Sequence, residues 1–372
     1  MLYLKERDAG NDSLSYGSRH LCRGDKKGNP MNLLVTGGAG FIGTNFVRFI
    51  VKHRPGWAVT VLDKLTYAGR KENLLEFEGL PGYRFIQGDI CDPAAVREAM
   101  AGCNGVVNFA AETHVDRSID DPSSFVKTDV EGVRILLEEF RKDDSRKMFL
   151  QISTDEVYGS VESGRSKEGD PLCPRSPYSA SKAGGELLAM SYFTTFGVPV
   201  TVTRASNNYG PYQYPEKLIP LFITNAFERE RLPLYGDGGN MRDWLFVDDH
   251  CSALVAVLER GRPGQIYNVG DGQELTNTEV TAAVIEATGA DRSLIRYVED
   301  RLGHDRRYAV DVSKLQRELG WKPEMDFATG ISVTVNWYRE NSQWWKSIKS
   351  GEFREYYRKM YSEKLDNSER IR

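Results

Sequence analysis

The residues best suited to chemistry lie in segment 153–159, Ser-Thr-Asp-Glu-Val-Tyr-Gly, and in a tyrosine–lysine pair that follows it. Tyr178 and Lys182 are four residues apart, so on a helix their side chains would share one face. A tyrosine pKa near ~10 is roughly three units too high for a base at neutral pH, a deficit of about 4 kcal/mol that a neighbouring ammonium can help to supply. The pair therefore predicts a general base that takes a proton from a substrate hydroxyl.

Asp155 and Glu156 are a second chemical resource in the same segment. Two adjacent carboxylates can reach different atoms of one substrate and be held in opposite protonation states, which a simple oxidation does not require. A plainer interpretation is that Ser153 and Glu156 form a capping box that only starts a helix. Likewise, Tyr178 can be an ordinary packing residue followed by a solvated lysine.

The apolar run 147–152 leads into this segment and predicts a buried strand. In an open parallel sheet, ligands bind at the carboxyl ends of the strands. The strand therefore has to place segment 153–159 at the ligand edge of a sheet, and a helix has to bring Tyr178 to the same edge.

The first predicted strand, residues 32–36, is followed at once by a glycine-rich loop at 37–43 and a helical pattern. Strand, glycine loop and helix form the fingerprint of a dinucleotide site, where the pyrophosphate rests on the helix N-terminus. Asp63 follows a second strand, residues 58–62, twenty residues after Gly43. There a carboxylate can bind the adenosine ribose and disfavour a 2′-phosphate, which favours NAD over NADP. The alternative is a solvated acid at a strand end.

Strands and helices continue to alternate up to Arg204, which predicts an α/β fold. We expect a Rossmann-type doubly wound parallel sheet with a smaller C-terminal substrate-binding α/β domain. The predicted division is a disordered leader or tail at 1–30, an NAD-binding domain at 31–204 to which about 243–270 returns, a mainly nucleotide-sugar-binding domain at 205–345, and a helical tail at 346–372.

The composition excludes several classes of protein. A net charge of -4 leaves no basic excess for a nucleic-acid or anionic-membrane surface. The five cysteines are scattered without a C-x-x-C pair, so we predict no disulfide framework and no metal site. No apolar run approaches the ~18 residues of a membrane helix. We therefore expect a cytoplasmic protein with a small-molecule substrate.

Two predicted helices, at 122–141 and 177–196, carry apolar residues on more than one face. Such helices often pack against a second subunit as well as their own sheet. This pattern predicts a homodimer built through a four-helix bundle.

Past Arg204 the chain has longer loops rich in proline, glycine and tyrosine, which usually build a binding lid. Arg242 and Arg301 lie in polar, loop-like settings and are candidates for a substrate diphosphate, because arginine forks match phosphate oxygens. Each of them can equally be a solvated surface arginine.

The motifs together resemble a known family. The Thr-Gly-x-x-Gly-x-x-Gly loop and Tyr-x-x-x-Lys resemble the extended short-chain dehydrogenase/reductase superfamily. Segments 108–119, 153–159, 178–183, 204–220, 234–250 and 300–311 are similar, within it, to the dTDP-glucose 4,6-dehydratases. Sister 4-epimerases lack the acidic pair after Ser-Thr. Leu302 departs from the family, which usually has proline there.

The resemblance implies roles for individual residues. Catalysis would fall to Thr154, Asp155, Glu156, Tyr178 and Lys182. NAD would be bound by Gly37, Gly40, Phe41, Ile42, Gly43, Asp63, Lys64, Leu65, Thr66, Asp89, Ile90, Phe109, Ala110, Ala111, Thr113, Thr128, Tyr178, Lys182 and Asn208. The nucleotide sugar would be bound by Thr113, Thr154, Asn207, Lys217, Leu218, Pro233, Leu234, Tyr235, Arg242, Asn277, Asp300, Arg301 and His304.

The implied reaction converts dTDP-glucose to dTDP-4-keto-6-deoxyglucose with tightly bound NAD. Oxidation at C4 by Tyr178, Lys182 and NAD makes the C5 proton acidic, Glu156 removes it, and Asp155 protonates the departing C6 hydroxyl. Thr154 would hydrogen-bond the C4 oxygen. Hydride then returns to C6. The alternatives are a dehydratase of UDP- or GDP-linked hexoses, a nucleotide-sugar 4-epimerase or decarboxylase, and a non-catalytic NAD-sensing protein of this fold.

Overall fold

The computed structural model describes residues 30–301 and 303–370. The leader predicted for residues 1–30 lies outside the described residues except for Pro30, and Leu302 also lies outside them. The fold is that of the unit Met31–Arg372.

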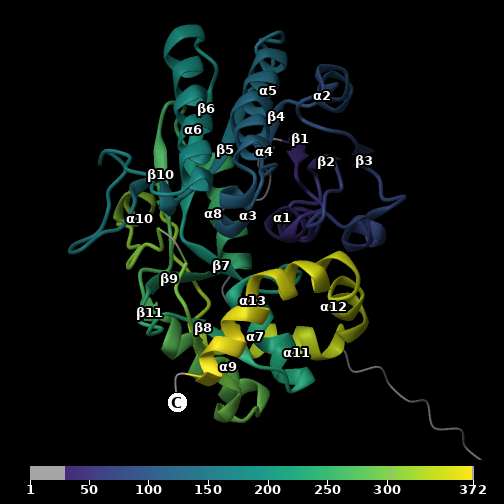
Figure 1. Ribbon diagram of the computed structural model, residues 1–372. Coiled ribbons are helices and arrows are strands. Elements are labelled where there is room, and N and C mark those ends of the chain that lie inside the picture. Colours follow the sequence, from purple (N-terminus) through teal and green to yellow (C-terminus); the bar gives the residue numbers. More distant parts are fainter. Residues whose placement is uncertain (1–29, 302, 371–372) are drawn as a thin grey trace, which may run out of the picture. The chain divides into compact units, whose positions relative to one another are not determined.

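A seven-stranded sheet has the order β10-β6-β5-β4-β1-β2-β3, and each neighbouring pair is parallel (Figure 1). Its strands are β1 (Asn32–Thr36), β2 (Ala58–Asp63), β3 (Tyr83–Gln87), β4 (Gly105–Asn108), β5 (Met148–Thr154), β6 (Val200–Ala205) and β10 (Ile266–Val269). The strand order reverses between β1 and β4, which is where such sheets bind ligands. The predicted doubly wound parallel sheet is confirmed.

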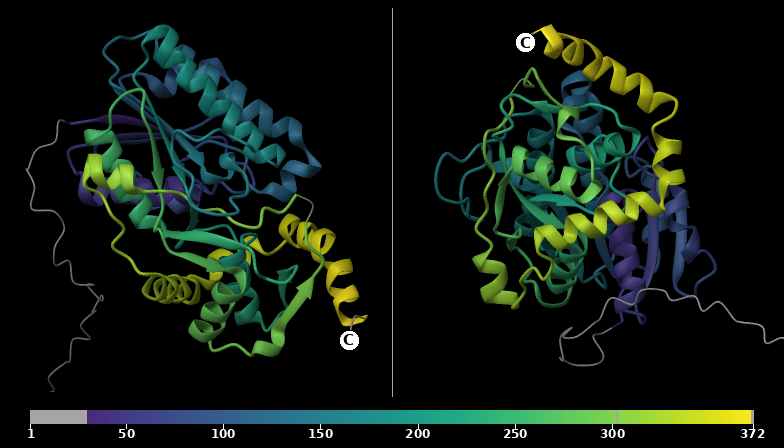
Figure 2. Two further views of the ribbon diagram at one scale, coloured as in Figure 1. Left: turned by 90° about the vertical axis from the view of Figure 1, so that its left-hand side faces the viewer. Right: turned by 90° about the horizontal axis from the view of Figure 1, so that it is seen from below.

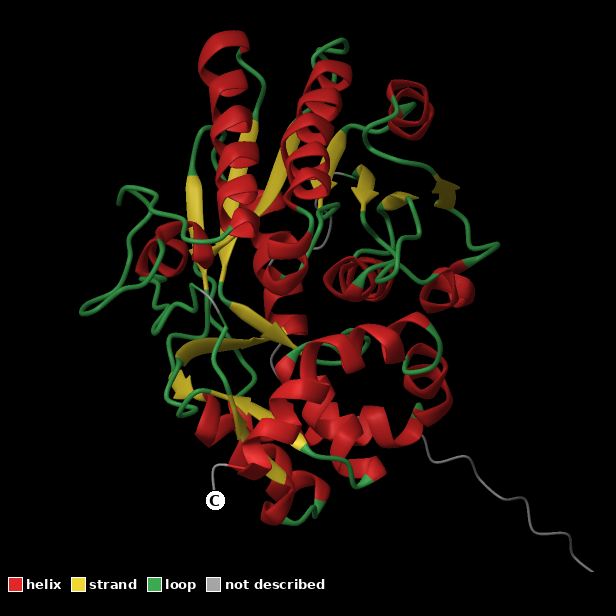
Figure 3. Cartoon of the chain, in the orientation of Figure 1, coloured by secondary structure: helices red, strands yellow, loops and turns green. Residues whose placement is uncertain are grey.

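Helices cover both faces of this sheet (Figure 3). Leu33 and Val35 of β1 join one core cluster with α1 (Phe41–His53) and α8 (Val247–Arg260). Leu34 joins the cluster on the opposite face, because successive strand side chains alternate. That face carries α2 (Pro93–Met100), α5 (Val133–Phe140) and α6 (Pro177–Phe196). Shorter elements between β2 and α5 are η1 (Lys71–Phe77), α3 (Val115–Asp120), α4 (Pro122–Val126) and η2 (Lys127–Gly132).

The single helix predicted over 122–141 is wrong in one respect, because a π-helical turn, η2, separates α4 from α5. The helix α6 packs against this turn so closely that a Cβ at Gly185 would stand 2.2 Å from the carbonyl oxygen of Asp129. A π-helical turn inside a helix often marks a functional site.

The rest of the unit builds a second core around smaller sheets. One contains β7 (Asn207–Tyr209), β9 (Met241–Phe246) and β11 (Glu274–Thr276), and the other β8 (Leu232–Tyr235) and β12 (Ile295–Val298). They pack with α7 (Leu218–Glu228), α9 (Asn277–Thr288), α11 (Phe327–Glu340), α12 (Ser342–Ile348) and α13 (Glu352–Arg370). Figure 2 shows the last three of these helices in yellow. The remaining elements are η3 (Asp155–Tyr158), η4 (Arg292–Leu294) and α10 (Ser313–Leu319).

Candidate active site

The acidic pair lies where β5 ends and η3 begins. The cap of η3 is Thr154, whose side-chain oxygen accepts the backbone N–H of Glu156 at 3.3 Å. The capping-box interpretation with Ser153 as the cap is therefore wrong. Since the Thr154 side chain accepts a free backbone N–H at the start of this short helix, neither carboxylate is needed for capping.

Asp155 is buried, with 2% of its surface exposed. Thr154 Oγ1 donates to its Oδ1 at 3.2 Å, and its Oδ2 has no hydrogen-bond partner among the described residues. Burial, and then the charges of Glu156 and Asp243, raise the pKa of Asp155 well above its usual value. Burial therefore favours the protonated form of this carboxyl over its ionised form.

Glu156 differs from its neighbour, because its side chain lines a polar cavity that Asp155 does not line. The Tyr308 hydroxyl lies 3.4 Å from Glu156 Oε2 and 2.6 Å from Asp305 Oδ2. The pair thus offers a buried acid and a carboxylate that reaches a cavity.

Tyr178 and Lys182 lie on the first turns of α6, whose start is fixed by Pro177 and a capping box of Ser176 and Ser179. Lys182 Nζ donates to the carbonyl oxygen of Ile152 in β5 at 2.8 Å, so the lysine is anchored to the strand that carries the acidic pair.

The protein's own charges oppose a phenolate at Tyr178. Burial, and then the carboxylates of Glu156, Asp129 and Asp155, raise the Tyr178 pKa well above its usual value, while a hydrogen bond with Thr154 lowers it. The base form of Tyr178 therefore needs a cation beside its ring.

A second cavity lies at the carboxyl ends of β1, β2 and β4 and fits a dinucleotide. A Cβ at Gly37 would stand 2.7 Å from the Ala110 nitrogen, and one at Gly43 would stand 2.3 Å from the Gly37 oxygen. The N-cap of α1, Gly40, has no side-chain cap, which leaves backbone N–H groups for a phosphate. The predicted residues that line this cavity are Gly37, Gly40, Phe41, Ile42, Gly43, Asp63, Lys64, Thr66, Asp89, Ile90, Phe109, Ala110, Ala111, Thr113, Thr128, Tyr178 and Lys182.

Asp63 is 7% exposed, so the alternative of a solvated acid is wrong. Its Oδ2 accepts the Ala39 N–H at 2.9 Å and its Oδ1 accepts the Leu65 N–H at 2.8 Å. Each carboxylate oxygen keeps a second lone pair, and the side chain lines the cavity. Asp63 thus holds the glycine loop and remains able to accept ribose hydroxyls.

The polar cavity that contains Glu156 is also lined by three cationic side chains, Lys217, Arg242 and Arg301. Arg301 Nε is buried without a hydrogen-bond partner among the described residues. Burial lowers the pKa of its guanidinium, but the charges of Asp116 and Glu156 raise it by more. An unpartnered buried donor next to two further cations suits an anionic ligand. The other predicted residues in the lining are Asn207, Leu218, Pro233, Tyr235, Asn277 and His304.

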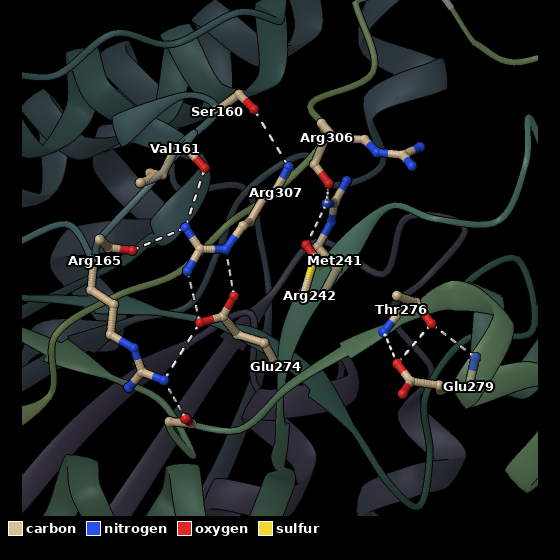
Figure 4. A network of polar contacts seen from close by, with 12 residues as sticks. Ser160, Val161, Arg165, Met241, Arg242, Glu274, Thr276, Glu279, Arg306 and Arg307 are labelled. Carbon is tan, nitrogen blue, oxygen red and sulfur yellow. Dashed lines mark hydrogen bonds and ion pairs between the residues drawn. The ribbon is translucent and has the colours of Figure 1, made fainter.

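The loop-like setting predicted for Arg242 is wrong, because this residue lies in β9 and is buried. Its guanidinium donates to the carbonyl oxygens of Met241 and Arg306 at 2.7 and 3.3 Å (Figure 4). It also donates to the Asp305 carbonyl oxygen at 2.8 Å. These bonds fix the guanidinium over the Tyr308 ring, 4.2 Å from its centroid.

Arg307 anchors the segment that carries Arg301 and His304. It forms a bidentate pair with Glu274 at 2.6 and 2.9 Å and donates to the Val161 and Gly164 carbonyl oxygens (Figure 4). The segment is thereby tied both to β11 and to the loop after η3.

The structure places several predicted binding residues elsewhere. Leu234 belongs to the second core, because alternation along β8 turns only Pro233 and Tyr235 to the cavity. Asp300 is exposed and contacts His304 Nδ1 at 2.5 Å, so it acts on His304 instead of lining the cavity. Leu65 packs against the first core and is absent from the dinucleotide cavity.

Three further residues differ from their predicted places in the cavities. Asn208 lines the polar cavity and not the dinucleotide cavity, because its amide contacts the Ser206 carbonyl oxygen and His250 Nδ1. Thr113 lines only the dinucleotide cavity, and its carbonyl oxygen accepts the Tyr67 hydroxyl. Thr154 lines neither, because its hydroxyl serves the start of η3.

Sequence reasoning missed several lining residues. Gln213 and Glu216 line both cavities together with Lys217, so the two cavities meet there. Glu216 stands beside Lys217 in the resembling segment 204–220, which could have identified it. Tyr361 of α13 lines the polar cavity with its ring centroid 6.0 Å from that of Tyr235, and nothing in the tail's pattern indicates this. The others in the polar cavity include His114, Val115, Asp116, Phe222 and Trp244.

Comparison with known proteins relates the chain to nucleotide-sugar dehydratases and epimerases. The family model described as GDP-mannose 4,6 dehydratase matches residues 34–334. A dTDP-glucose 4,6-dehydratase of Streptomyces griseus is 53% identical over 319 residues, covering 85% of this chain and 97% of that protein.

Two solved structures show the same relationship. DesIV (dTDP-glucose 4,6-dehydratase) from Streptomyces venezuelae, with NAD and TYD bound, matches with a TM-score of 0.84 and 50% identity over 86% of this chain and 100% of that one. The UDP-glucose 4-epimerase of Thermus thermophilus, in complex with NAD, matches with a TM-score of 0.77 and 33% identity over 84% and 100%. The chain therefore belongs to the dTDP-glucose 4,6-dehydratase family of the extended short-chain dehydrogenase/reductases.

Proposed function

We propose that this protein dehydrates dTDP-glucose to dTDP-4-keto-6-deoxyglucose, with NAD in the dinucleotide cavity. The observation that carries the proposal is Asp155, a buried carboxyl with a raised pKa next to Glu156, which reaches the polar cavity. An acid and a base so close together suit the elimination of water. The names of the relatives and the NAD and TYD in the DesIV structure support the same substrate and cofactor.

When bound, NAD supplies a hydride acceptor and a cationic nicotinamide ring. Tyr178 takes the C4 hydroxyl proton as the hydride leaves C4, with Lys182 one turn further along α6 and Thr154 hydrogen-bonded to the phenol. Glu156 then takes the C5 proton, and Asp155 gives its proton to the departing C6 hydroxyl. Hydride returns to C6 and a proton to C5. Each turnover thus adds a proton to Tyr178 and removes one from Asp155, so solvent must restore both groups.

The alternatives differ in what they need from the site. A 4-epimerase or decarboxylase has no use for a protonated Asp155 near C6, and a protein that only senses NAD needs neither the base nor the acid. A UDP- or GDP-linked hexose remains the second candidate substrate. Incubation of the purified protein with dTDP-, UDP-, GDP- and CDP-glucose, followed by the ultraviolet absorbance of 4-keto product, tests the proposal. Product from dTDP-glucose at the highest kcat/KM supports it, whereas preference for another nucleotide or no turnover refutes it.

We also propose the residues that bind the two ligands. NAD would contact the predicted residues that line the dinucleotide cavity. The nucleotide sugar would contact Asn207, Lys217, Leu218, Pro233, Tyr235, Arg242, Asn277, Arg301 and His304, to which Tyr361 is added. The two main cores support a division into an NAD-binding part, which includes α8 and β10, and a nucleotide-sugar-binding part.

Arg301→Met should raise the KM for dTDP-glucose by about 10- to 100-fold, because a hydrogen bond to a charged group contributes ~1.5–3 kcal/mol. The methionine keeps an apolar stem but cannot donate to a diphosphate, while kcat should change little because no reacting atom is touched. Steady-state kinetics measures both constants. Arg306→Met is a matched control, since Arg306 pairs with exposed Asp237 at 2.6 and 3.0 Å outside the cavity, and its KM should stay that of the wild type. Equal effects of the two variants would contradict the assignment.

The homodimer stays a proposal, supported by exposed apolar side chains on α4 and α6. Val126 is 55% exposed and Leu187 59%, and Phe196 is also exposed. The helices α5 and α6 contact each other and lie side by side (Figure 2), so two copies can form a four-helix bundle.

Leu187→Asp should weaken this dimer by at least about 100-fold in Kd, since a buried charge at an apolar interface costs ~3 kcal/mol or more. Light scattering at micromolar concentration should show a monomer for this variant and a dimer for the wild type. Leu75→Asp, at an exposed leucine of η1, should remain dimeric. A monomeric wild type would refute the dimer.

A cytoplasmic location is likewise a proposal. Cys91, Cys103, Cys173 and Cys251 are free thiols, which fits a reducing compartment. Among the described residues, no helix is both long and apolar enough to cross a bilayer.

A further inference from the structure

Lys182 is a buried ammonium that needs a counter-charge. Its side chain is buried, and among the described residues its one hydrogen bond is to the neutral carbonyl oxygen of Ile152. Burial lowers the Lys182 pKa, while two carboxylates, Asp129 and Glu186, raise it. The question is which of the two is free to compensate the lysine charge.

Glu186 already has a cation of its own. Arg204 Nε donates to its two oxygens at 3.0 and 3.3 Å, and Arg204 Nη2 donates at 2.5 Å, with both side chains buried. A bidentate guanidinium–carboxylate pair has almost no net charge, so it exerts little electrostatic effect on neighbouring groups. Glu186 therefore contributes little net charge to Lys182.

Asp129 has no such cation. It is 2% exposed, and it accepts the Ser181 hydroxyl at 2.6 Å and the Glu112 backbone N–H at 3.1 Å. Among the described residues, no lysine, arginine or histidine forms an ion pair or hydrogen bond with it. A buried carboxylate bound only by neutral donors needs a positive charge nearby.

The packing of α6 brings this carboxylate to the lysine. Because Gly184 and Gly185 have no Cβ, α6 lies directly against the π-helical turn η2 that carries Asp129. Ser181, which immediately precedes Lys182, reaches Asp129 from the same helix. A π-helical turn is rare and frequently occurs at functional sites, so its position beside α6, which carries Tyr178 and Lys182, indicates a functional role.

We propose that Asp129 supplies the counter-charge of Lys182 from beyond ion-pair distance, as a positioning residue that keeps the lysine in its ammonium form for the work of Tyr178. This inference rests on the proposed function. The charged and titratable groups that interact with Asp129 are Lys182 and Tyr178 from α6 and Glu112 from the loop after β4, while Glu186 interacts with Lys182. Burial raises the pKa of Asp129 to about 6, so it is mostly ionised at neutral pH and above.

The test is the pH dependence of C4 oxidation, followed as NADH absorbance after mixing the holoenzyme with dTDP-glucose. Asp129→Asn keeps the size and the acceptor oxygen but removes the charge, so Lys182 should lose its proton at lower pH. The alkaline limb should move down by about one pH unit or more, a tenfold loss of rate on that side, with little loss on the acid side. Ser181→Ala keeps the carboxylate and should leave the alkaline limb in place. An unmoved alkaline limb in Asp129→Asn, or an equal loss at every pH, overturns the proposal.

If Asp129→Asn reacts too slowly for the kinetic assay, a titration of Lys182, which needs no turnover, tests the same proposal. In wild-type holoenzyme with ¹³C-labelled lysine side chains, the Lys182 signal is identified by its loss in Lys182→Arg. In Asp129→Asn this signal should titrate at least about one pH unit lower than in the wild type, because the compensating charge is gone. The same titration in both proteins refutes the counter-charge. Absence of any NADH signal in the wild type would instead count against the proposed function, and the lysine titration still decides the role of Asp129.

Discussion

Asp155→Asn should reduce its NAD on mixing with dTDP-glucose and then stop, with turnover lowered by about 10²- to 10⁴-fold. Tyr178 and Lys182 are untouched, so C4 oxidation proceeds, but an amide cannot give a proton to the C6 hydroxyl. The side chain is buried and its Oδ1 is bonded by Thr154, so an isosteric amide has a place to sit. Stopped-flow absorbance of NADH measures the accumulation, and product assays measure the turnover.

Glu156→Gln is the informative partner of this variant. It should also accumulate NADH, but only Asp155→Asn should still exchange the C5 hydrogen with solvent deuterium, because Glu156 is then present to remove it. The expected role of Glu156 in removing the C5 hydrogen follows from its place in the lining of the polar cavity. Product formation by Asp155→Asn at the wild-type rate would remove Asp155 from the role of acid.

The spacing of apolar residues and the positions of glycine and proline were enough to predict the parts of the fold that depend on local sequence. The strand, glycine loop and helix at the start of the chain predict one local fold. Only glycine tolerates the close approach of backbone atoms found at Gly37 and Gly43. The alternation of strands and helices then fixes a parallel sheet. Segment 153–159 falls at the carboxyl end of β5 for the same reason.

Orientation within an element was harder to predict. Pro233, Leu234 and Tyr235 appear equivalent in sequence, but the pleat of β8 sends Leu234 into the core and its neighbours to the cavity. Arg242 looks like a loop residue because glycines precede it, yet it is held inside β9 by three backbone carbonyls.

Long-range packing was beyond the sequence. The π-helical turn at Asp129 arises where α6 presses on it through Gly185, a contact between segments more than fifty residues apart in the chain. Tyr361 reaches the polar cavity only because α13 packs against β12, and the tail lies past residue 334, where the family match ends. Neither contact has a local signature in the residues themselves.

Tyr178→Phe should show no NADH signal on mixing with dTDP-glucose, and its turnover should fall by about 10²- to 10⁴-fold, the usual contribution of a positioned base. The phenylalanine keeps the ring that meets Phe125 edge-on at 6.2 Å, so α6 and the cavity should keep their shape, and the melting temperature and NAD content should match those of the wild type. The variant thus separates loss of the base from loss of binding.

In the wild type the hydride leaves C4 and returns to C6 within one turnover, so substrate deuterated at C4 should give product labelled at C6 without added NAD. A full NADH signal from Tyr178→Phe would mean that another group takes the hydroxyl proton, and label lost to solvent or to external NADH would mean that the hydride does not stay in the site.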